Sequence, residues 1–457
     1  RFIPYVSSST ATDNLAGFST TTTTSAPDDY GNILSQSVAY ANGPTHSRTI
    51  VYNNDATNWL VARPCSIKTT MAQSGNPNIV QLVTTTYETG KVKPDVVKYF
   101  DGAIQKKQLN YDYNNTNGTL SAFHELSTGL TEKHTTYGYD ANGINMTSTT
   151  DPTGITSSSS YYPASGLLNT TTDHWGNVTT YTYDNLGNFA TVAKTNGVGV
   201  SSNVLAFVTS PTNARYSATQ TMSDGSQTIN YYDVLGREIR QGVKLFNGTI
   251  SCTQTDYNAK GQAYRVSEPF LSVGSATLWN TTTFDNYGRV LTYTPSVGAS
   301  SSYSYSGGTT SVTSNGRTYT TVTSNATGWP SSKTDPGGTI SYLYKPDGNV
   351  KQITAPGNVI TTMTYDTQGN QLSLVDPSAG NTTYTYFGGG ELNTQVTPKG
   401  TTTNYYLADG RIDYYTNPAG TYDYTYGTNK LVSSITSPGG VSRNYTYYPN
   451  GKVNEIS

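Results

Sequence analysis

The chain of 457 residues is long enough for roughly three average domains or for one long array of repeats. Charged residues make up only 12%, whereas aromatic residues also reach 12% and tyrosine occurs 39 times. This composition argues against a disordered polyelectrolyte and against a charged helical bundle. The formal net charge of −2 supplies no basic field to attract phosphate groups, so we expect no nucleic-acid partner.

The sequence also predicts no membrane span, because no window approaches the roughly 18 to 20 uninterrupted apolar residues of a membrane helix. Cys65 and Cys252 match no metal or redox spacing, which leaves a single disulfide or two unpaired thiols open. Abundant serine and threonine with few lysines are typical of extracellular β-proteins. We therefore expect an extracellular or cell-surface location.

The N-terminal segment, residues 1–97, precedes the regular pattern of the chain. We expect its run from Thr20 to Thr24 to be a flexible or extended linker. The following stretch from Asp28 to Ile33 carries an acidic residue and a glycine in the order that recurs later as a turn signature. We interpret residues 1–97 as a degenerate β segment and residues 98–457 as a regular repeat array.

The regular array repeats a short motif with a period of about 20 or 21 residues in its last third. Thr180 to Phe189 read TYTYDNLGNF, and relatives recur around Tyr232, Phe284, Tyr365 and Tyr406. An aromatic residue precedes the aspartate position in each unit, and a glycine follows that aromatic residue after four positions in most units. The residues that we expect to carry the repeat are Tyr139, Asp140, Gly143, Tyr183, Asp184, Gly187, Tyr232, Asp233, Gly236, Phe284, Asp285, Gly288, Tyr365, Asp366, Gly369, Tyr406 and Gly410.

Each part of the unit predicts a structure. The alternation in Tyr181 to Tyr183 places two rings on one face of a strand. The segment Asp184 to Gly187 then predicts a hairpin turn, because the aspartate can cap backbone amides and the glycine can adopt positive φ. Proline and glycine connectors such as Asp335 to Gly338 separate the units.

One unit of two short strands cannot bury its own face, so we expect neighbouring units to stack tyrosine on tyrosine. The predicted fold class is all-β: an array of short antiparallel hairpins that forms one continuous curled sheet, as a spiral, tube-like or solenoid shell.

These units resemble the YD repeats of Rhs proteins, of the B and C components of bacterial Tc toxins, and of animal teneurins. The resemblance covers Tyr99 to Ser457, and Asn58 to Pro64 are similar to a segment that often precedes the regular repeats. It implies a β-sheet that spirals into a hollow shell, often around a C-terminal toxin. The chain departs from toxin-releasing Rhs shells because it stops at Asn454 to Ser457 inside a repeat and shows no Asp-Pro-Ile-Gly-Leu-like boundary. The resemblance therefore does not carry the toxin-delivery role over to this chain.

No residue pattern predicts catalysis, a metal site or a cofactor. The histidines His46, His124, His134 and His174 are scattered and form no HExxH motif. The turn aspartates resemble half of a calcium loop, but the distal glutamate is missing, so turn capping is favoured. No Gly-x-Ser-x-Gly motif occurs, and serines such as those at 157–160 are expected in low-complexity loops. The tyrosines could bind sugars, but their strand-alternating positions favour packing.

A simple estimate connects the repeat to a shape. About forty strands spaced about 4.8 Å apart give a ribbon on the order of 190 Å long, which would enclose a drum about 60 Å across in one circuit. Such a drum cannot close into a capped container, and its ends would present unpaired strand edges. Complementary ends would add copies head to tail without limit.

The leading hypothesis from the sequence is a non-catalytic, secreted structural protein that assembles with copies of itself into an extracellular fibre or tube. One alternative is a fragment of an Rhs- or Tc-toxin-like hollow shell that encapsulates a toxin. Another is a cell-surface adhesin that binds glycans or cell-surface proteins.

Overall fold

The computed structural model describes residues 4–194, 201–448 and 451–457, so the expected segments 1–97 and 98–457 each include a few residues outside the described part. Forty β-strands and no helix occur in these ranges. Accordingly, the described residues include no helix with the length and apolar character needed to cross a membrane.

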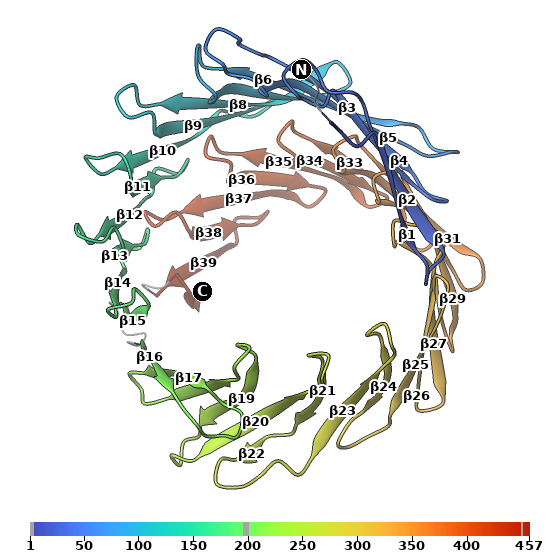
Figure 1. Cartoon of the computed structure of the whole chain (residues 1–457). Helices are drawn as coiled ribbons and strands as arrows, with labels where there is room; N and C mark the ends of the chain where they lie inside the picture. Colours follow the sequence, from blue (N-terminus) through green and yellow to red (C-terminus); the bar gives the residue numbers. More distant parts are fainter. Residues whose placement is uncertain (1–3, 195–200, 449–450) are drawn as a thin grey trace.

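The strands follow one another along the whole described chain, with short turns between most of them (Figure 1). The first thirteen are β1 (Ser8–Asp13), β2 (Phe18–Thr24), β3 (Ser35–Tyr40), β4 (Thr45–Tyr52), β5 (Pro64–Ala72), β6 (Ile79–Tyr87), β7 (Pro94–Asp101), β8 (Ile104–Tyr113), β9 (Leu120–Ser127), β10 (Lys133–Tyr139), β11 (Met146–Thr150), β12 (Thr156–Tyr161) and β13 (Leu168–Thr172). The next thirteen are β14 (Val178–Tyr183), β15 (Phe189–Lys194), β16 (Ser201–Phe207), β17 (Tyr216–Met222), β18 (Gln227–Tyr232), β19 (Glu238–Lys244), β20 (Ile250–Tyr257), β21 (Ala263–Ser267), β22 (Phe270–Leu271), β23 (Trp279–Phe284), β24 (Val290–Thr294), β25 (Ser301–Ser306) and β26 (Thr309–Ser314). The last fourteen are β27 (Arg317–Thr323), β28 (Pro330–Asp335), β29 (Gly338–Tyr344), β30 (Val350–Ala355), β31 (Val359–Tyr365), β32 (Gln371–Asp376), β33 (Gly380–Tyr386), β34 (Leu392–Thr397), β35 (Gly400–Tyr406), β36 (Ile412–Asn417), β37 (Gly420–Tyr426), β38 (Val432–Thr436), β39 (Ser442–Tyr447) and β40 (Val453–Ile456).

All forty strands belong to one antiparallel sheet, which confirms the predicted fold class. Nearly every strand pairs with the strand before it and the strand after it in sequence, as in β33, β34 and β35. The sequence order changes only at β20, whose two halves pair with β22 and β21, and β21 then pairs with β23. The sheet is not closed, because within the described chain β1 pairs only with β2 and β40 only with β39.

Two polar segments that were expected outside the strands lie within the sheet. Thr20 to Thr24, expected to be a linker, belong to β2, which pairs with both β1 and β3. The serines at 157–160, expected in a loop, belong to β12 and pair with β11 and β13. Threonine favours a pleated surface, and in a sheet whose faces meet water, hydroxyl side chains pack as well as apolar ones. The prediction of a linker and of a loop from low sequence complexity was therefore wrong for these two segments.

The sheet forms one layer rather than a packed globule. The accessible surface is 26013 Å², whereas a compact protein of this mass exposes roughly 17,000 Å². Figure 1 shows the strands arranged around an open centre. Few apolar side chains are buried; the buried ones among the described residues are Met71, Ile79, Leu109, Ala122, Ala214, Cys252, Pro44 and Pro346. Hydrophobic burial in a common core therefore cannot be the main contact between units.

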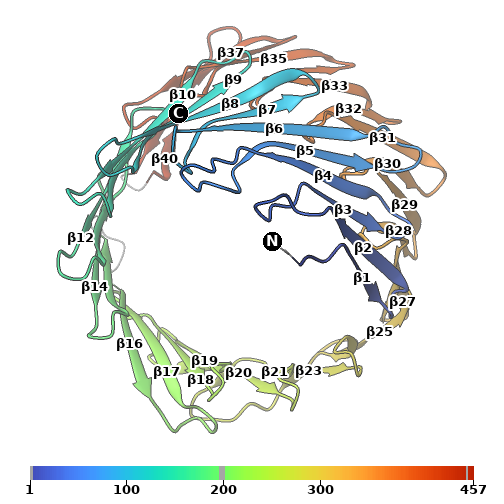
Figure 2. The same ribbon diagram turned by 45° about the horizontal axis from the view of Figure 1, so that its top comes forward.

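The ribbon makes more than one circuit, which corrects the single-circuit drum expected from its length. In Figure 1 the chain runs once around the ring from β1 to about β26, and the C-terminal strands then run along the N-terminal ones. Figure 2 shows the same arrangement, with β33, β35 and β37 beside β7 to β10. Contacts between the two circuits join residues that are 258 to 300 positions apart. The length estimate missed this overlap because it fixed the length of the ribbon but not its curvature.

Both cysteines are free, so the structure resolves the alternative that the sequence left open. Cys252 is buried opposite Phe270, at the place where β20 and β22 pair. Cys65 lies half-buried in β5. The sheet is therefore held together without a covalent bridge between these two positions.

The proline and glycine connectors of the C-terminal units pack on one another. Gly400 has φ 129°, and a Cβ at this position would clash with Pro418 of the next connector. Each of these glycines leaves room for a proline about eighteen residues further on. The contacts of this Pro–Gly ladder are Gly338 with Pro356, Gly380 with Pro398, Gly400 with Pro418 and Gly420 with Pro438. The spacing of units is thus fixed at the connector edge by backbone conformation and ring shape.

We expect Gly400→Ala to destabilise the C-terminal units by at least about 1 to 2 kcal/mol, because positive φ alone costs an L-residue about that much and the methyl group would also displace Pro418. Denaturant unfolding followed by circular dichroism measures the change. Lys399→Ala is the matched control in the same turn, since Lys399 is exposed and contributes its backbone amide to Thr397. Equal midpoints for the two variants would contradict the ladder.

Candidate functional site

The aromatic residue that precedes the aspartate position of a unit is called its register residue below, and the turn that follows it is called the YD turn. This turn is the most constant polar structure of the chain. Tyr183 ends β14, and Asp184 then accepts hydrogen bonds at Oδ1 from the backbone amides of Leu186 and Asn188, both 2.9 Å long. Gly187 has φ 83°, so the chain reverses without strain. A β-bulge directly before Tyr183 completes the turn.

The residue after the glycine binds the second oxygen of the turn aspartate. Asn188 donates from Nδ2 to Asp184 Oδ2, and Arg289 donates from Nε to Asp285 Oδ2 at 2.7 Å. The hydrogen bonds from Asn188 and from the turn amides lower the pKa of Asp184. Burial raises the pKa of Asp285, but the hydrogen bonds from Arg289 outweigh it and lower that pKa. Both aspartates are therefore ionised at neutral pH, and asparagine and arginine are alternative partners for the same carboxylate.

In some turns the aspartate lies two positions further along the chain than Asp184 does in its turn. Asp409 follows Tyr406 by three residues, yet it binds Arg411 through Nε at 2.9 Å. Asp347 binds Asn349 in the same way at 3.0 Å. Asp347 and Asp409 were not among the predicted repeat residues, because the acidic residue was expected directly after the aromatic one. The signal that would have found them is the paired Arg or Asn that follows the glycine.

The register tyrosines are linked to the preceding unit through their hydroxyl groups. Eight of them donate a hydrogen bond to the backbone carbonyl that opens the second strand of the unit before them, 14 or 15 residues earlier in seven cases and 19 residues earlier for Tyr257. Such bonds are Tyr183 to Leu168 (2.9 Å), Tyr257 to Glu238 (2.8 Å), Tyr305 to Val290 (2.9 Å), Tyr344 to Pro330 (2.7 Å), Tyr386 to Gln371 (2.9 Å), Tyr406 to Leu392 (2.8 Å), Tyr426 to Ile412 (2.6 Å) and Tyr447 to Val432 (2.8 Å). This series is called the tyrosine ladder below.

Arginines add a second link between neighbouring units. Arg289 is held by Asp285 and lies over the ring of Tyr305 in the next unit, with Cζ 4.2 Å from the ring centroid. Arg411 lies over Tyr426 at 4.1 Å in the same way. The turn aspartate thus orients a cation that packs on the following tyrosine. This arrangement gives a physical reason for arginine after the turn glycine.

Direct stacking of tyrosine rings is less general than the sequence analysis expected. Close parallel pairs join rings on adjacent strands, such as Tyr405 with Tyr414 (4.2 Å) and Tyr415 with Tyr422 (4.7 Å). The register tyrosines instead use their hydroxyl groups, because successive register residues are separated by an intervening strand. Hydrogen bonds therefore replace much of the ring stacking that we expected between units.

The second circuit meets the first at a seam between two kinds of turn. The YD turns of β25 to β40 lie against the turns of the first circuit that follow odd-numbered strands, from the β1–β2 turn to the β13–β14 turn. Two backbone hydrogen bonds cross the seam, from Ala326 N to Ala41 O (3.1 Å) and from Gly388 N to Thr128 O (2.9 Å). Side chains add further bonds, such as Gln81 Nε2 to Thr367 O at 2.7 Å. The seam therefore joins the edges of the sheet through turns and not through a strand ladder.

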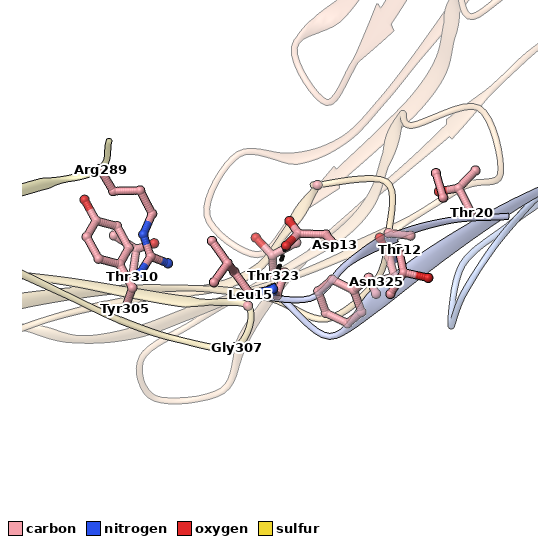
Figure 3. Close-up of a pocket in the computed structure, with 16 residues that line it drawn as sticks. Thr12, Asp13, Leu15, Thr20, Arg289, Tyr305, Gly307, Thr310, Thr323 and Asn325 are labelled. Atoms are coloured by element: carbon pink, nitrogen blue, oxygen red, sulfur yellow. Dashed lines mark hydrogen bonds between the residues drawn. The ribbon is translucent and has the colours of Figure 1, made fainter. Parts of the chain in front are cut away.

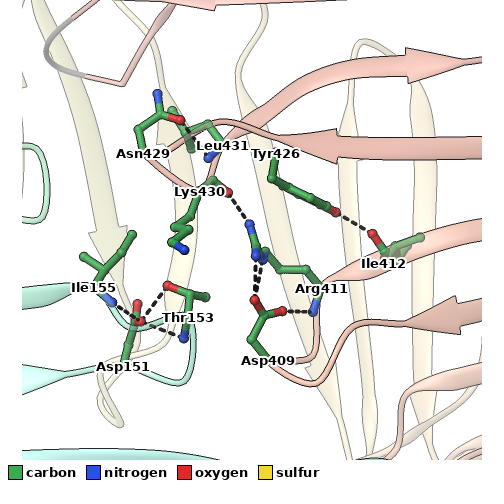
Figure 4. Close-up of polar contacts among 10 residues, drawn as sticks. All are labelled: Asp151, Thr153, Ile155, Asp409, Arg411, Ile412, Tyr426, Asn429, Lys430 and Leu431. Atoms are coloured by element: carbon green, nitrogen blue, oxygen red, sulfur yellow. Dashed lines mark hydrogen bonds and ion pairs between the residues drawn. The ribbon is translucent and has the colours of Figure 1, made fainter.

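Ion pairs strengthen part of the seam. Lys133, at the start of β10, binds Glu391 of the second circuit and also lies 3.8 Å from Glu125. Figure 4 shows the next contact zone, where Arg411 and Lys430 face the turn that Asp151 caps. The hydrogen bonds that Arg411 donates to Asp409, together with the nearby charge of Asp151, raise the pKa of Arg411. Opposite charges thus face each other across the seam.

His46 and His174 lie at this seam, and His124 and His134 lie on the strand pair that carries Lys133, although the sequence showed all four only as scattered. His46 bonds through Nε2 to Pro346 O at 2.8 Å, and His174 stacks on Trp175, whose ring covers Gly451. His124 and His134 stack on each other with centroids 4.9 Å apart, near Lys133. Burial lowers the pKa of His124, but hydrogen bonds to the carboxylates of Glu132 and Asp112 and the charges of these groups together outweigh burial and raise that pKa. The signal was missed because the seam brings together residues that share no motif.

A cavity of about 560 Å³ lies at the beginning of the seam. Asp13 and Leu15 of the first hairpin form one wall, and Arg289 and Tyr305 form part of the other (Figure 3). The amides of Ala16 and Leu15 lower the pKa of Asp13, and Arg289 lowers it further. Asp13 is therefore used as a turn cap at this cavity.

The structure places the predicted repeat residues at equivalent points of the turns. Tyr139, Tyr183, Tyr232, Phe284, Tyr365 and Tyr406 each end a strand. Asp140, Asp184, Asp233, Asp285 and Asp366 follow directly and each cap their turn, and Gly143, Gly187, Gly236, Gly288, Gly369 and Gly410 all have positive φ. Within the described ranges, no group of three or more His, Cys, Asp or Glu side chains is arranged to hold a metal ion.

We expect Tyr406→Phe to lower the free energy of unfolding by about 0.5 to 1.5 kcal/mol, because Leu392 O loses the shorter of its two side-chain hydrogen bonds and keeps only the one from Asn404 Nδ2. Tyr405→Phe is the matched control, since the Tyr405 ring is 40% exposed and its hydroxyl donates no hydrogen bond within the described residues. Equilibrium unfolding in urea compares the two. A loss of stability in Tyr405→Phe equal to that in Tyr406→Phe would contradict the role of the ladder.

The seam is tested by charge reversal at Lys133 and Glu391. Lys133→Glu and Glu391→Lys should each speed hydrogen exchange of the Gly388 amide, because each places like charges together at a partly buried contact. The double variant should slow the exchange again, since it restores an opposite pair. Lys399→Glu, an exposed charge reversal in a connector, is the control. Additive effects in the double variant would show that the pair does not hold the seam.

No protein-family model matches the sequence, and no curated protein is similar to it in sequence. Solved structures are similar in fold. The crystal structure of TcdB2-TccC3 aligns with 96% of this chain at 13% identity and a TM-score of 0.68. A Photorhabdus luminescens Tc holotoxin pore with a mutated TccC3 aligns with 96% of the chain at 12% identity and a TM-score of 0.67.

The chain spans about a third of the length of these structures, since it covers 36% and 37% of the matched chains. At this level of identity the comparison concerns the fold. The YD-repeat resemblance that the sequence indicates is thus confirmed for the fold, and the chain has the antiparallel β-sheet shell fold of the Tc toxin structures.

Proposed function

We propose that this chain is a section of the wall of a hollow YD-repeat shell that encloses a polypeptide and assembles with other protein subunits. The observation that carries the proposal is the seam, because it joins successive circuits of a one-layer sheet into a continuous wall. A wall of this kind needs rigidity and closed joints rather than a common core. The tyrosine ladder and the Pro–Gly ladder make the wall rigid, and the seam closes the joint between successive circuits.

The comparisons favour this alternative over the fibre that the sequence analysis placed first. The matched structures are TcdB2-TccC3 and a Tc holotoxin pore, and a holotoxin pore suggests assembly with other protein subunits. Neither a head-to-tail homopolymer nor a glycan-binding adhesin gains support from them. We propose a non-catalytic role for this section and a location outside the producing cell, in keeping with a toxin-like assembly.

Electron microscopy of the purified chain, after long incubation at micromolar concentration, separates a wall section from a fibre. We expect discrete particles that contain the open, overlapping spiral of Figure 1, with a mass that does not grow with time. The turns of successive circuits contact each other within one molecule, so the second circuit is held in place without further copies. Filaments of constant width that lengthen with time would contradict the shell and support the fibre.

Protease protection tests the enclosing role in the natural particle that contains this chain. We expect a polypeptide that resists protease in buffer and becomes cleavable once denaturant opens the wall. The Lys133→Glu variant should expose it at a lower denaturant concentration, because the seam is weakened. A particle in which all polypeptide outside the sheet is cleaved in buffer would contradict the enclosing role.

A further inference from the structure

A second cavity lies away from the seam, where the YD-turn edge of the sheet carries an unusual number of arginines. It has a volume of about 570 Å³ and is lined by the loop from Pro211 to Arg215, the turn at Asp233 and parts of β19 and β20. The chain contains only eleven arginines in 457 residues, and four of them lie between positions 215 and 265. Three of these, Arg215, Arg237 and Arg240, line the cavity.

The acidic side chains at this cavity already have arginine partners. Asp233 binds Arg237 through Nε (2.8 Å) and a terminal nitrogen (2.6 Å), as in other YD turns. Asp256 binds Arg265, which does not line the cavity, at 2.6 Å. Among the described residues, Arg215 and Arg240 form no ion pair. The cavity thus holds two guanidinium charges that the protein does not neutralise.

Arg240 is held in place by neutral groups. Its terminal nitrogen donates to Gln254 Oε1 at 2.6 Å, and its Cζ lies 5.2 Å from the ring centroid of Phe270. The side chain of Gln254 is itself oriented, because its Nε2 donates a hydrogen bond to Asp256 Oδ1 at 2.9 Å. Arg240 Nε is buried and has no acceptor in the described structure. A buried donor without a partner is costly, and an anionic oxygen close to this guanidinium would remove that cost.

The remaining walls of the cavity supply hydroxyl and ring groups. Thr212 and Thr255 carry hydroxyls, and the rings of Tyr257 and Tyr264 line the same space. Tyr257 is fixed by its bond to Glu238 O and by Arg237, whose Cζ lies 4.5 Å from the ring centroid. Fixed aromatic rings beside hydroxyl and amide groups suit a polyhydroxylated ligand of small-molecule size.

We propose that this cavity binds a small hydroxylated ligand that bears an oxyanion, with Arg240 and Arg215 as the residues that neutralise the anion. Arg237 and Asp233 form the wall and keep their roles in the turn. A carboxylate and a phosphate present the same charge-assisted acceptors to a guanidinium, so the proposal concerns the oxyanion on a sugar-sized scaffold. The inference does not rest on the shell function, because it concerns charge and shape at a single place on the sheet.

Isothermal titration of the full chain with glucuronate, glucose 6-phosphate and glucose tests the proposal. We expect saturable binding of at least one of the two anions and at least tenfold weaker binding of neutral glucose. Binding of glucuronate alone would assign a carboxylate, and binding of glucose 6-phosphate alone would assign a phosphate. Binding of both anions no tighter than glucose would overturn the proposal.

Arg240→Gln and Arg215→Gln should each weaken binding of the anion at least tenfold. Arg317→Gln, which removes an exposed arginine at the start of β27, is the matched control and should bind as the unaltered chain does. Circular dichroism and the thermal midpoint establish that each variant is folded. Arg215 lies exposed on a loop, so we expect Arg215→Gln to fold. This variant therefore tests the proposal even if Arg240→Gln does not fold. Unchanged affinity in a folded Arg215→Gln chain would overturn the assignment.

Discussion

A one-layer sheet must hold its shape without a hydrophobic core, and this constraint explains most of the polar features of the chain. Both faces of such a sheet meet water or a lumen, so each hairpin has only its two neighbours to pack on. The hydroxyl of Tyr406 and the guanidinium of Arg411 each reach from one unit to the next. These contacts are directional, and they can therefore fix both the spacing and the curvature of successive units.

The YD turn combines three requirements in six residues. The aspartate satisfies backbone amides that the turn leaves without strand partners, and the glycine allows the reversal. The residue after the glycine neutralises the aspartate and, when it is arginine, packs on the next tyrosine, as Arg289 does on Tyr305. The motif is therefore a connection between units as much as a turn.

The structure within single hairpins, meaning the strands and the turns between them, could largely be predicted from the sequence. The turn at Asp184 and Gly187 follows from residue types whose conformational preferences act within a few positions. The Thr-rich strand β2 was missed because its residues suit both a polar linker and a sheet without a core. The position of Asp409 was missed because the carboxylate reaches Arg411 from another point of the same turn.

The seam could not be predicted, because its contacts join residues 258 to 300 positions apart that share no pattern. The pair Lys133 and Glu391 is unremarkable in sequence, and so is His46 facing Pro346. Their proximity depends on the summed curvature of more than twenty strands, which small changes of twist at each hairpin would alter. The cavity at Arg240 was missed for a similar reason, since its charge becomes visible only when Asp233 and Asp256 are seen to have other partners.

The overlap of circuits also explains why the YD turns differ in sequence from one part of the chain to another. Turns that lie in the seam must fit against another turn, and Thr367 and Gly388 are small enough to let the backbones approach. Equivalent turns outside the seam carry Leu235 and Tyr287, which are 71% and 70% exposed. The same turn geometry is thus kept throughout, while the side chains at its tip vary with what the spiral places beside them. Each unit therefore has to meet two physical demands, the contacts inside the unit and those set by its position in the circuit.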